Sequence, residues 1–188
     1  MKIIVVSDTH GNEKKLENII LKHQDADLFL HLGDGAEEFF KIKSKYPNVI
    51  MEIVRGNCDF EYDFLPDEKT FSAGSHTILA SHGYKYNVKS GLDDYIQAAR
   101  KKSADIILYG HTHKKLTKIE NDLYIMNPGS LARPRIGGPS YGVINVNNNK
   151  IAMNIVDYVE QIWMINFWSY SDLYIMFWQF GWGENSEY

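Results

Sequence analysis

Short apolar segments alternate with segments of helical periodicity over the first third of the chain. The segments expected to form strands are 2–6, 27–32 and 49–54, and those expected to form helices are 13–23 and 36–46. In the first of these helices, Leu16, Ile19 and Ile20 recur at the spacing that places them on one face. This alternating order is typical of parallel strands joined by crossover helices.

From residue 69 onward the pattern is dominated by hairpins. Hairpins are expected over 69–81, 116–129 and 141–158, with turns at Gly74 and Ser75, at Asn121 and Asp122, and at the asparagine run 147–149. Between the first two hairpins we expect a helix at 91–103 and a strand at 105–110. Residues 1–158 are therefore predicted to form one layered α/β domain, built on a mixed sheet or on two facing sheets.

Residues 159–188 form an aromatic-rich C-terminal extension of a different character. The extension contains all four tryptophans and no lysine or arginine. Polar residues interrupt it, and a central Asp172 is costly in lipid, so a membrane span is not expected. We expect an amphipathic element that packs on the domain or on a second subunit, giving a homo-oligomer. A frameshifted or artefactual end is the alternative.

Composition and charge narrow the compartment and the partners. The 188 residues carry a formal net charge of −4, so binding to long nucleic acid, which requires a strongly basic face, is not expected. Cys58 is the only cysteine, which excludes an intramolecular disulfide and suits a reducing compartment. The first apolar run stops at Ser7 and is too short for a signal peptide. We therefore expect a cytoplasmic protein with no membrane partner.

Five of the expected strands are each followed at once by Asp, Asn or His side chains. These residues are Asp8, His10, Asp34, Asn57, Asp59, His82, His111 and His113. Taken singly, Asp8 and Asp34 would be helix N-caps, Asn57 a turn residue and His82 a histidine bonded to backbone. Taken together they indicate one site, because ligands bind beyond the carboxyl ends of strands in open α/β sheets.

The chemistry of this set favours divalent metal ions. Without Asp59, it comprises two carboxylates, four imidazoles and one amide, which suit Mn, Fe, Co, Ni or Zn rather than a cysteine-rich zinc site. Seven ligands exceed the needs of one tetrahedral ion and suit two ions that share a carboxylate. The remaining histidines fall outside the pattern: we expect His31 in the strand core and His23 and His76 at the surface.

Five short motifs carry a resemblance to a known family. In chain order they are SDTHG, LGDG, RGNCD, SHG and GHTH, and the segment NPGSLARPR follows them. Their order and spacing resemble the calcineurin-like metallophosphoesterases, in particular the small bacterial and archaeal phosphodiesterases, over residues 1–158. The resemblance implies an α/β fold with four layers, an α/β/β/α sandwich of two mixed sheets flanked by helices.

The resemblance also implies a dinuclear metal centre and a reaction. The ligands of one divalent ion would be Asp8, His10 and His113, those of the other Asn57, His82 and His111, and Asp34 would bridge both. We expect Mn²⁺, with Ni²⁺, Fe²⁺, Co²⁺ or Zn²⁺ as alternatives. Asn57, His82 and Asp59 are the candidate catalytic residues, Asp59 by orienting a ligand histidine. A hydroxide bridging the metals would attack the phosphorus of a small or nucleotide-like phosphodiester.

Two further features bear on the substrate and on alternative functions. Cys58 stands where many relatives have a histidine thought to protonate the leaving oxygen, and a thiol is a poor substitute for that acid. A small buried filler is the other role considered for Cys58. Arg133 and Arg55, with Arg135, are candidates for contacts with a substrate anion. A phosphomonoesterase and a non-catalytic metal-binding interaction scaffold are the alternative functions, and the complete ligand set favours catalysis.

Overall fold

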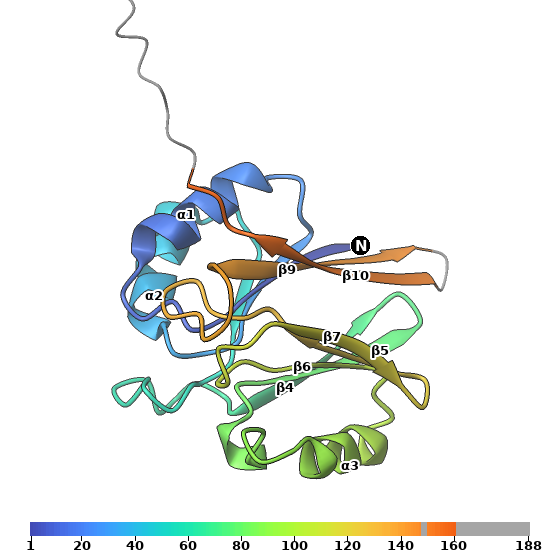
Figure 1. The fold of residues 1–188 in the computed structure, drawn as a ribbon. Coiled ribbons are helices and arrows are strands. Elements are labelled where there is room, and N and C mark those ends of the chain that lie inside the picture. The colour runs from blue at the N-terminus through green and yellow to red at the C-terminus, as the bar shows by residue number, and fades with distance from the viewer. Residues whose placement is uncertain (148–149, 161–188) are drawn as a thin grey trace, which may run out of the picture.

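The computed structural model describes residues 1–147 and 150–160, which form two five-stranded sheets packed face to face (Figure 1). The first sheet contains, in spatial order, β10 (Lys150–Asp157), β9 (Ser140–Asn147), β1 (Lys2–Val6), β2 (Leu28–His31) and β3 (Met51–Ile53). The second contains β4 (Glu68–Ala73), β5 (His76–Ser81), β6 (Ile106–Leu108), β8 (Leu123–Asn127) and β7 (Leu116–Glu120). Both sheets are mixed, with three parallel strands in each, β1–β2–β3 and β5–β6–β8.

Helices cover the outer faces of both sheets and complete four layers. α1 (Glu13–Lys22) and α2 (Ala36–Lys45) pack against the first sheet. α3 (Asp93–Lys101) packs against the second sheet, and a short 3-10 helix, η1 (Tyr84–Tyr86), precedes it (Figure 1). The predicted α/β/β/α sandwich of two mixed sheets is confirmed.

Side-chain alternation explains why β1 is apolar from Ile3 to Val6. Ile3 and Val5 pack between the two sheets, whereas Ile4 and Val6 pack against the helical layer. All four side chains are buried, because successive strand residues point to opposite faces and both faces of this sheet are covered. Polar side chains are therefore excluded from these four positions and appear again where the strand ends.

The predicted turns are present where the structure describes them. Asn121 and Asp122 both have positive φ, 48° and 63°, as a two-residue type I′ turn requires. β9 and β10 form the expected hairpin, but 148–149 in its turn lie outside the described residues. The predicted packing of the extension lies outside them too, beyond residue 160. Over the described ranges, no helix is long and apolar enough to cross a membrane.

The parallel strands of both sheets end at the same edge of the sandwich, and hydrogen bonds join their loops there. His82, after β5, donates through Nδ1 to the carbonyl oxygen of Leu32, after β2, at 2.6 Å. The backbone N–H of His111, after β6, donates to Asp8 Oδ2, after β1, at 3.2 Å. The fold thus brings the polar loops of two separate sheets into direct contact.

We expect Tyr95→Phe to lower the free energy of unfolding by about 1 kcal/mol. The buried Tyr95 hydroxyl lies 3.0 Å from the carbonyl oxygen of Leu79 and 2.9 Å from that of Leu108, which ties α3 to β5 and β6. Phenylalanine keeps the ring and leaves both carbonyls without this donor. Urea unfolding measures the change, and a variant as stable as the wild type would refute this tie.

Candidate metal centre

The candidate ligands stand on backbone of unusual conformation. Nine described non-glycine residues have positive φ, and five of them are candidate ligands: Asp8 (54°), His10 (38°), Asp34 (57°), His111 (63°) and His113 (57°). Left-handed backbone is unfavourable for such residues and is concentrated at functional sites, where surrounding structure enforces it. The local strain therefore marks this edge as a built site.

Glycines allow the strained loops to approach one another closely. Gly33 has φ of 92°, and a Cβ atom there would lie 2.5 Å from the backbone nitrogen of Gly56. A Cβ atom at Gly110 would lie 1.9 Å from Ser7 Oγ. Larger residues at these positions would push the ligand loops of β1, β2, β3 and β6 apart.

One group of ligands converges around Asp8. Ligand atoms of Asp8, His10, Asp34 and His113 all lie within 4.8 Å of one another. His10 Nε2 and His113 Nε2 are 3.4 Å apart, and His113 Nε2 is 3.1 Å from Asp8 Oδ1. Asp8 Oδ1 is the one buried side-chain oxygen or nitrogen of the described residues that has no hydrogen-bond partner. A cation at this position would supply the missing partner, so the residues fit a metal ion.

A second group of ligands converges around His82. His82 Nε2 lies 3.0 Å from Asn57 Oδ1, and the His82 and His111 rings are 5.0 Å apart. Asp34 Oδ2 is 3.5 Å from His82 Nε2 and 3.9 Å from His10 Nε2, so it lies between the two groups. The structure therefore brings the seven candidate side chains to one edge, with Asp34 between the two groups.

Backbone carbonyls orient two of the histidines. His113 Nδ1 lies 2.7 Å from the carbonyl oxygen of Arg133, and His82 Nδ1 lies 2.6 Å from that of Leu32. A carbonyl oxygen only accepts, so both Nδ1 atoms carry hydrogen and donate. In the neutral imidazole, Nε2 then keeps its lone pair and points into the site, as a metal ligand requires.

The charges of the site also suit a divalent cation. Burial raises the pKa of the Asp8 carboxyl, but the imidazoles of His113 and His82 and the Ser7 hydroxyl hold that pKa below its ordinary value. The pKa of Asp34 is also lowered, because His82 and the N–H of Cys58 outweigh burial. Burial and the neighbouring His82 lower the pKa of His111 to about 4. Two carboxylates are therefore ionised at neutral pH beside a neutral imidazole.

Asp59 organises the loop that carries Asp34. Its buried carboxylate accepts hydrogen bonds of 2.7–2.9 Å from the backbone N–H groups of Asp34, Gly35, Ala36 and Gly56. Asp59 was expected to orient a ligand histidine, but its carboxylate binds backbone N–H groups instead, so that expectation is wrong. Asp59 acts on Asp34, because the start of α2 offers N–H donors that have no partner within the helix.

The predicted substrate-binding arginines differ in position. A cavity of about 350 Å³ opens on the ligands, and Arg133 and Arg135 line it together with Lys89. Arg55 does not line this cavity: its Nη2 and Nε donate to Asp67 Oδ1 at 2.8 Å and 3.1 Å. Lys89 was missed from sequence because it lies in an irregular segment after η1, where no periodicity or motif marks it.

The structure excludes one of the two interpretations of Cys58. The cysteine is exposed, so the buried-filler interpretation is wrong. It lines the ligand cavity, and its backbone N–H donates to Asp34 Oδ1 at 2.7 Å. Desolvation and the Asp34 carboxylate raise the pKa of its thiol to about 11, so the thiol is protonated at neutral pH.

The remaining histidines are not ligands of this site. His31 is buried as expected, 2.9 Å from Thr9 Oγ1. The surface prediction for His23 and His76 is wrong, because both are half-buried: His23 Nε2 lies 2.9 Å from the Tyr141 hydroxyl, and His76 packs beside Asp105. Their positions depend on contacts with distant segments that periodicity does not show.

Comparison with known proteins identifies the family to which this chain belongs. Residues 1–149 match the family model described as the calcineurin-like phosphoesterase superfamily domain. The chain therefore belongs to the calcineurin-like phosphoesterase superfamily, as its motifs predicted. Membership and the Asp and His cluster support a metal-dependent phosphoester hydrolase.

Two relatives extend the match over most of the chain. The probable metallophosphoesterase YsnB of Bacillus subtilis (strain 168) is 32% identical over 160 residues, which cover 84% of this chain and 91% of YsnB. The phosphodiesterase YfcE of Escherichia coli (strain K12) is 26% identical over 179 residues, which cover 86% of this chain and 97% of YfcE.

Solved structures share the fold at lower identity. A predicted phosphoesterase from Streptococcus pneumoniae TIGR4 has a TM-score of 0.71 and 24% identity, covering 85% of this chain and 93% of its own. Vps29 of Entamoeba histolytica, solved as a complex with Zn²⁺, has a TM-score of 0.65 and 22% identity, and the match covers 84% of this chain and 99% of the Vps29 chain. At these identities the likeness is one of fold.

We expect Asp59→Ala to destabilise the protein by about 3 kcal/mol and to weaken metal binding by at least about 10-fold. Four backbone N–H groups would lose a charged acceptor, and Asp34 would lose its fixed position. The Asp59→Asn variant keeps one acceptor oxygen, so its stability and its metal affinity should lie between those of the wild type and those of Asp59→Ala. Urea unfolding and titration with Mn²⁺ measure both effects. If the Asp59→Ala variant had the stability and the Mn²⁺ affinity of the wild type, Asp59 would not be the residue that fixes the Asp34 loop.

Proposed function

We propose that this protein is a phosphodiesterase that hydrolyses a small or nucleotide-like phosphodiester at a centre of two divalent metal ions. The convergence of seven oxygen and nitrogen ligands in two groups that share Asp34 carries the proposal. The relative YfcE is named a phosphodiesterase, which supports a diester as the substrate class. Mn²⁺ is the proposed ion, with Ni²⁺, Fe²⁺, Co²⁺ and Zn²⁺ as alternatives of the same ligand preference.

The ligand roles follow from the two groups. Asp8, His10 and His113 would hold one ion, and Asn57, His82 and His111 the other, with Asp34 shared between them. When bound by these residues, divalent ions would lower the pKa of a bound water molecule and offset the charge on the phosphate oxygens. The chain itself fixes where each ligand atom points, through the strained loops and the carbonyls that hold Nδ1 of His82 and His113.

Arg133 is the proposed binding residue for the phosphate group of the substrate. It lines the ligand cavity, its side chain is exposed, and it forms no ion pair with the described residues. A guanidinium can donate two parallel hydrogen bonds to phosphate oxygens. The Arg133 carbonyl also accepts a hydrogen bond from His113 Nδ1, which keeps the Arg133 backbone beside a candidate ligand.

Hydrolysis of bis(p-nitrophenyl) phosphate should depend on added metal and on Asp34. Chelator-stripped protein should be inactive and should regain activity with Mn²⁺. Asp34→Asn, which removes the shared charge, should lower kcat/KM by at least about 100-fold. Release of p-nitrophenolate measures the rates, with Mn²⁺, Ni²⁺, Co²⁺, Zn²⁺ and Mg²⁺ added back singly.

A matched control separates loss of this carboxylate from loss of a charge elsewhere. Asp122→Asn makes the same chemical change in the β7–β8 turn, at a left-handed position that asparagine tolerates. This turn precedes β8, which runs parallel to β6, so it lies at the opposite edge from the ligands. The control should keep wild-type activity. Equal activity of Asp34→Asn and Asp122→Asn would overturn the metal-centre proposal.

We expect diesters with aryl leaving groups to be cleaved at least about 100-fold faster than those with alkyl leaving groups. A factor of this size is the rate enhancement that a general acid typically contributes. The position that faces the cavity beside Asn57 is Cys58, and a thiol is a poor proton donor to an alkoxide. Rates for thymidine 5′-phosphate esters of p-nitrophenol, phenol and methanol measure the preference.

Substitution at Cys58 tests whether the preference comes from this position. Cys58→His should narrow the aryl-to-alkyl ratio, because an imidazole on the cavity rim can protonate the leaving oxygen. Cys58→Ala should keep the wild-type ratio, because it supplies no acid. Similar rates for aryl and alkyl esters in the wild type would show that a proton donor is already present.

The alternative functions are separated by the same assays. A phosphomonoesterase would use the same ligand set, and it would hydrolyse p-nitrophenyl phosphate faster than the diester. A metal-binding interaction scaffold would bind Mn²⁺ and hydrolyse neither compound. The proposed homo-oligomer through residues 159–188 is a separate proposal, which size-exclusion chromatography with light scattering would test.

A further inference from the structure

The ligand cavity adjoins a second, larger cavity, which is lined by four cationic side chains together with apolar ones. This basic cavity has a volume of about 650 Å³, and its cationic side chains are Lys89, Lys114, Lys115 and Arg135. Lys89 and Arg135 line the ligand cavity as well, so the two cavities share a wall. No acidic side chain of the described residues lines the basic cavity.

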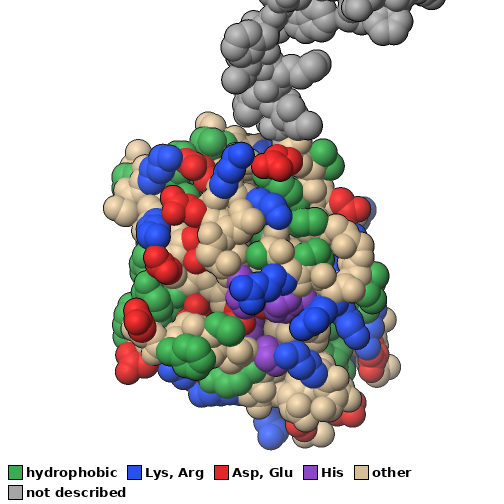
Figure 2. All heavy atoms as spheres, turned by 60° about the vertical axis from the view of Figure 1, so that its left-hand side comes forward, with side chains coloured by type: hydrophobic (Ala, Val, Ile, Leu, Met, Phe, Trp, Pro, Cys, Tyr) green, Lys and Arg blue, Asp and Glu red, His purple; other side chains and the backbone are tan. Residues whose placement is uncertain are grey.

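Most of these cations have no counter-ion in the described part of the chain. Lys115 pairs with Asp157, whereas Lys89, Lys114 and Arg135 form no ion pair there. All three are exposed. Figure 2 shows Lys and Arg side chains gathered over and to the right of the exposed histidines. On a chain with a net charge of −4, such a local excess of positive charge raises the local concentration of anions.

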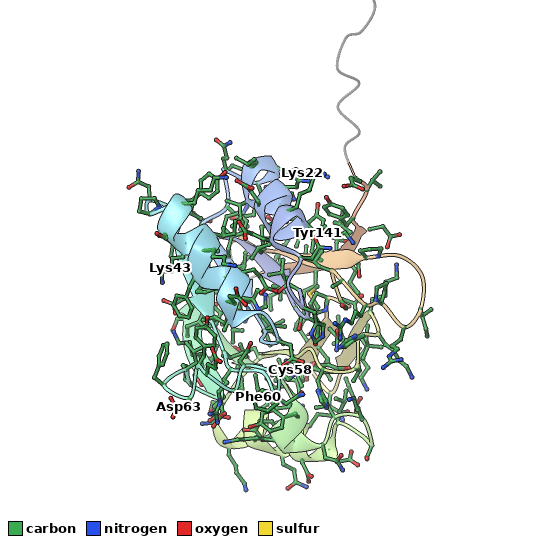
Figure 3. The ribbon with its side chains drawn as sticks, turned by 90° about the vertical axis from the view of Figure 1, so that its left-hand side faces the viewer. Lys22, Lys43, Cys58, Phe60, Asp63 and Tyr141 are labelled. Carbon is green, nitrogen blue, oxygen red and sulfur yellow. The ribbon has the colours of Figure 1, made fainter. Side chains whose placement is uncertain are left out.

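The other side of the ligand cavity has the opposite character. A cavity of about 370 Å³ adjoins it at His10, Asp34 and Cys58 and is lined by Glu37, Glu61 and Phe60 among others. Figure 3 shows Cys58 and Phe60 along the loop that follows β3. The carboxylates on this side disfavour a second anionic group, whereas the exposed Phe60 ring accepts an apolar one.

The scissile phosphate does not need three further cations. A phosphodiester carries a single negative charge. Two divalent ions and Arg133 would supply more positive charge than is needed to neutralise it. Lys89, Lys114 and Arg135 therefore lie beside the reaction centre without a partner in a singly charged substrate. Like charges held close together repel, and a second anion between them removes that repulsion.

We propose that the basic cavity binds a second anionic group of the substrate. The natural substrate would then be a diester that carries a further phosphate, such as a nucleotide with a terminal phosphate in addition to the scissile one. This inference rests on the proposed diesterase function. The asymmetry of the two flanking cavities also fixes the orientation, with the second phosphate toward Lys114 and the other ester group toward Phe60.

A matched pair of substrates isolates the second anion. Thymidine 5′-(p-nitrophenyl phosphate) and its 3′-phosphorylated form have the same scissile bond and leaving group and differ in one phosphate. With Mn²⁺-loaded full-length protein, we expect kcat/KM to be about 10-fold higher for the 3′-phosphorylated form, mostly through KM. The double variant Lys89→Gln with Lys114→Gln should reduce this ratio to about 1.

A charge-matched control and a binding measurement complete the test. The double variant Lys22→Gln with Lys101→Gln removes two exposed lysines from the ends of α1 and α3, away from these cavities, and should keep the wild-type ratio. Calorimetry with thymidine 5′-phosphate and thymidine 3′,5′-bisphosphate measures the same preference without catalysis. The bisphosphate should bind about 10-fold more tightly to the wild type but not to the Lys89→Gln, Lys114→Gln double variant.

The outcomes separate this inference from the proposed function. Equal kcat/KM for the two esters, or a preference that persists in the Lys89→Gln, Lys114→Gln double variant, overturns the second-anion site and leaves the diesterase intact. Bisphosphate preference in calorimetry without hydrolysis of either ester supports the anion site and overturns the diesterase. If calorimetry shows no bisphosphate preference and neither ester is hydrolysed, both the second-anion site and the diesterase function are overturned.

Discussion

The site depends on one constraint, which is that two sheets packed face to face must bring the ends of their parallel strands to one edge. Asp8 and Asp34 come from the first sheet, and His82 and His111 from the second. The inter-sheet apolar core fixes the distance between these sets, and hydrogen bonds from His82 to Leu32 and from His111 to Asp8 fix the register. A metal centre shared between the sheets is possible only because that packing is rigid.

Holding the ligands in this arrangement is energetically unfavourable for the loops themselves. Five candidate ligands lie in the left-handed region, the Asp8 and Asp34 carboxylates lie close together, and Asp8 Oδ1 is buried without a partner. The surrounding structure opposes these costs: Asp59 gathers four N–H groups around the Asp34 loop. A cation would offset the remaining charge and satisfy Asp8, so metal binding and local stability are coupled.

Family membership accounts for the candidate metal centre, but it does not specify the side chains that surround the centre in this chain. The ligand cavity is bordered by cations without counter-ions on one side and by carboxylates and an exposed phenylalanine on the other. Members of a superfamily can share ligands and differ in what flanks them, because loops vary more freely than the strands that carry them. In this protein the side chains that flank the candidate ligands come largely from the loops after β3, β5, β6 and β8.

The sequence by itself determined the elements and the candidate ligands. Apolar alternation is local, so it predicted the strands, and polar residues directly after them marked the edge where Asp34 and His113 meet. Only the tertiary structure decided which charges are paired. Arg55 is neutralised by Asp67, Lys89 joins the cavity, and Asp59 holds backbone rather than a histidine. These outcomes depend on contacts between segments far apart in the chain, which packing sets and local periodicity does not encode.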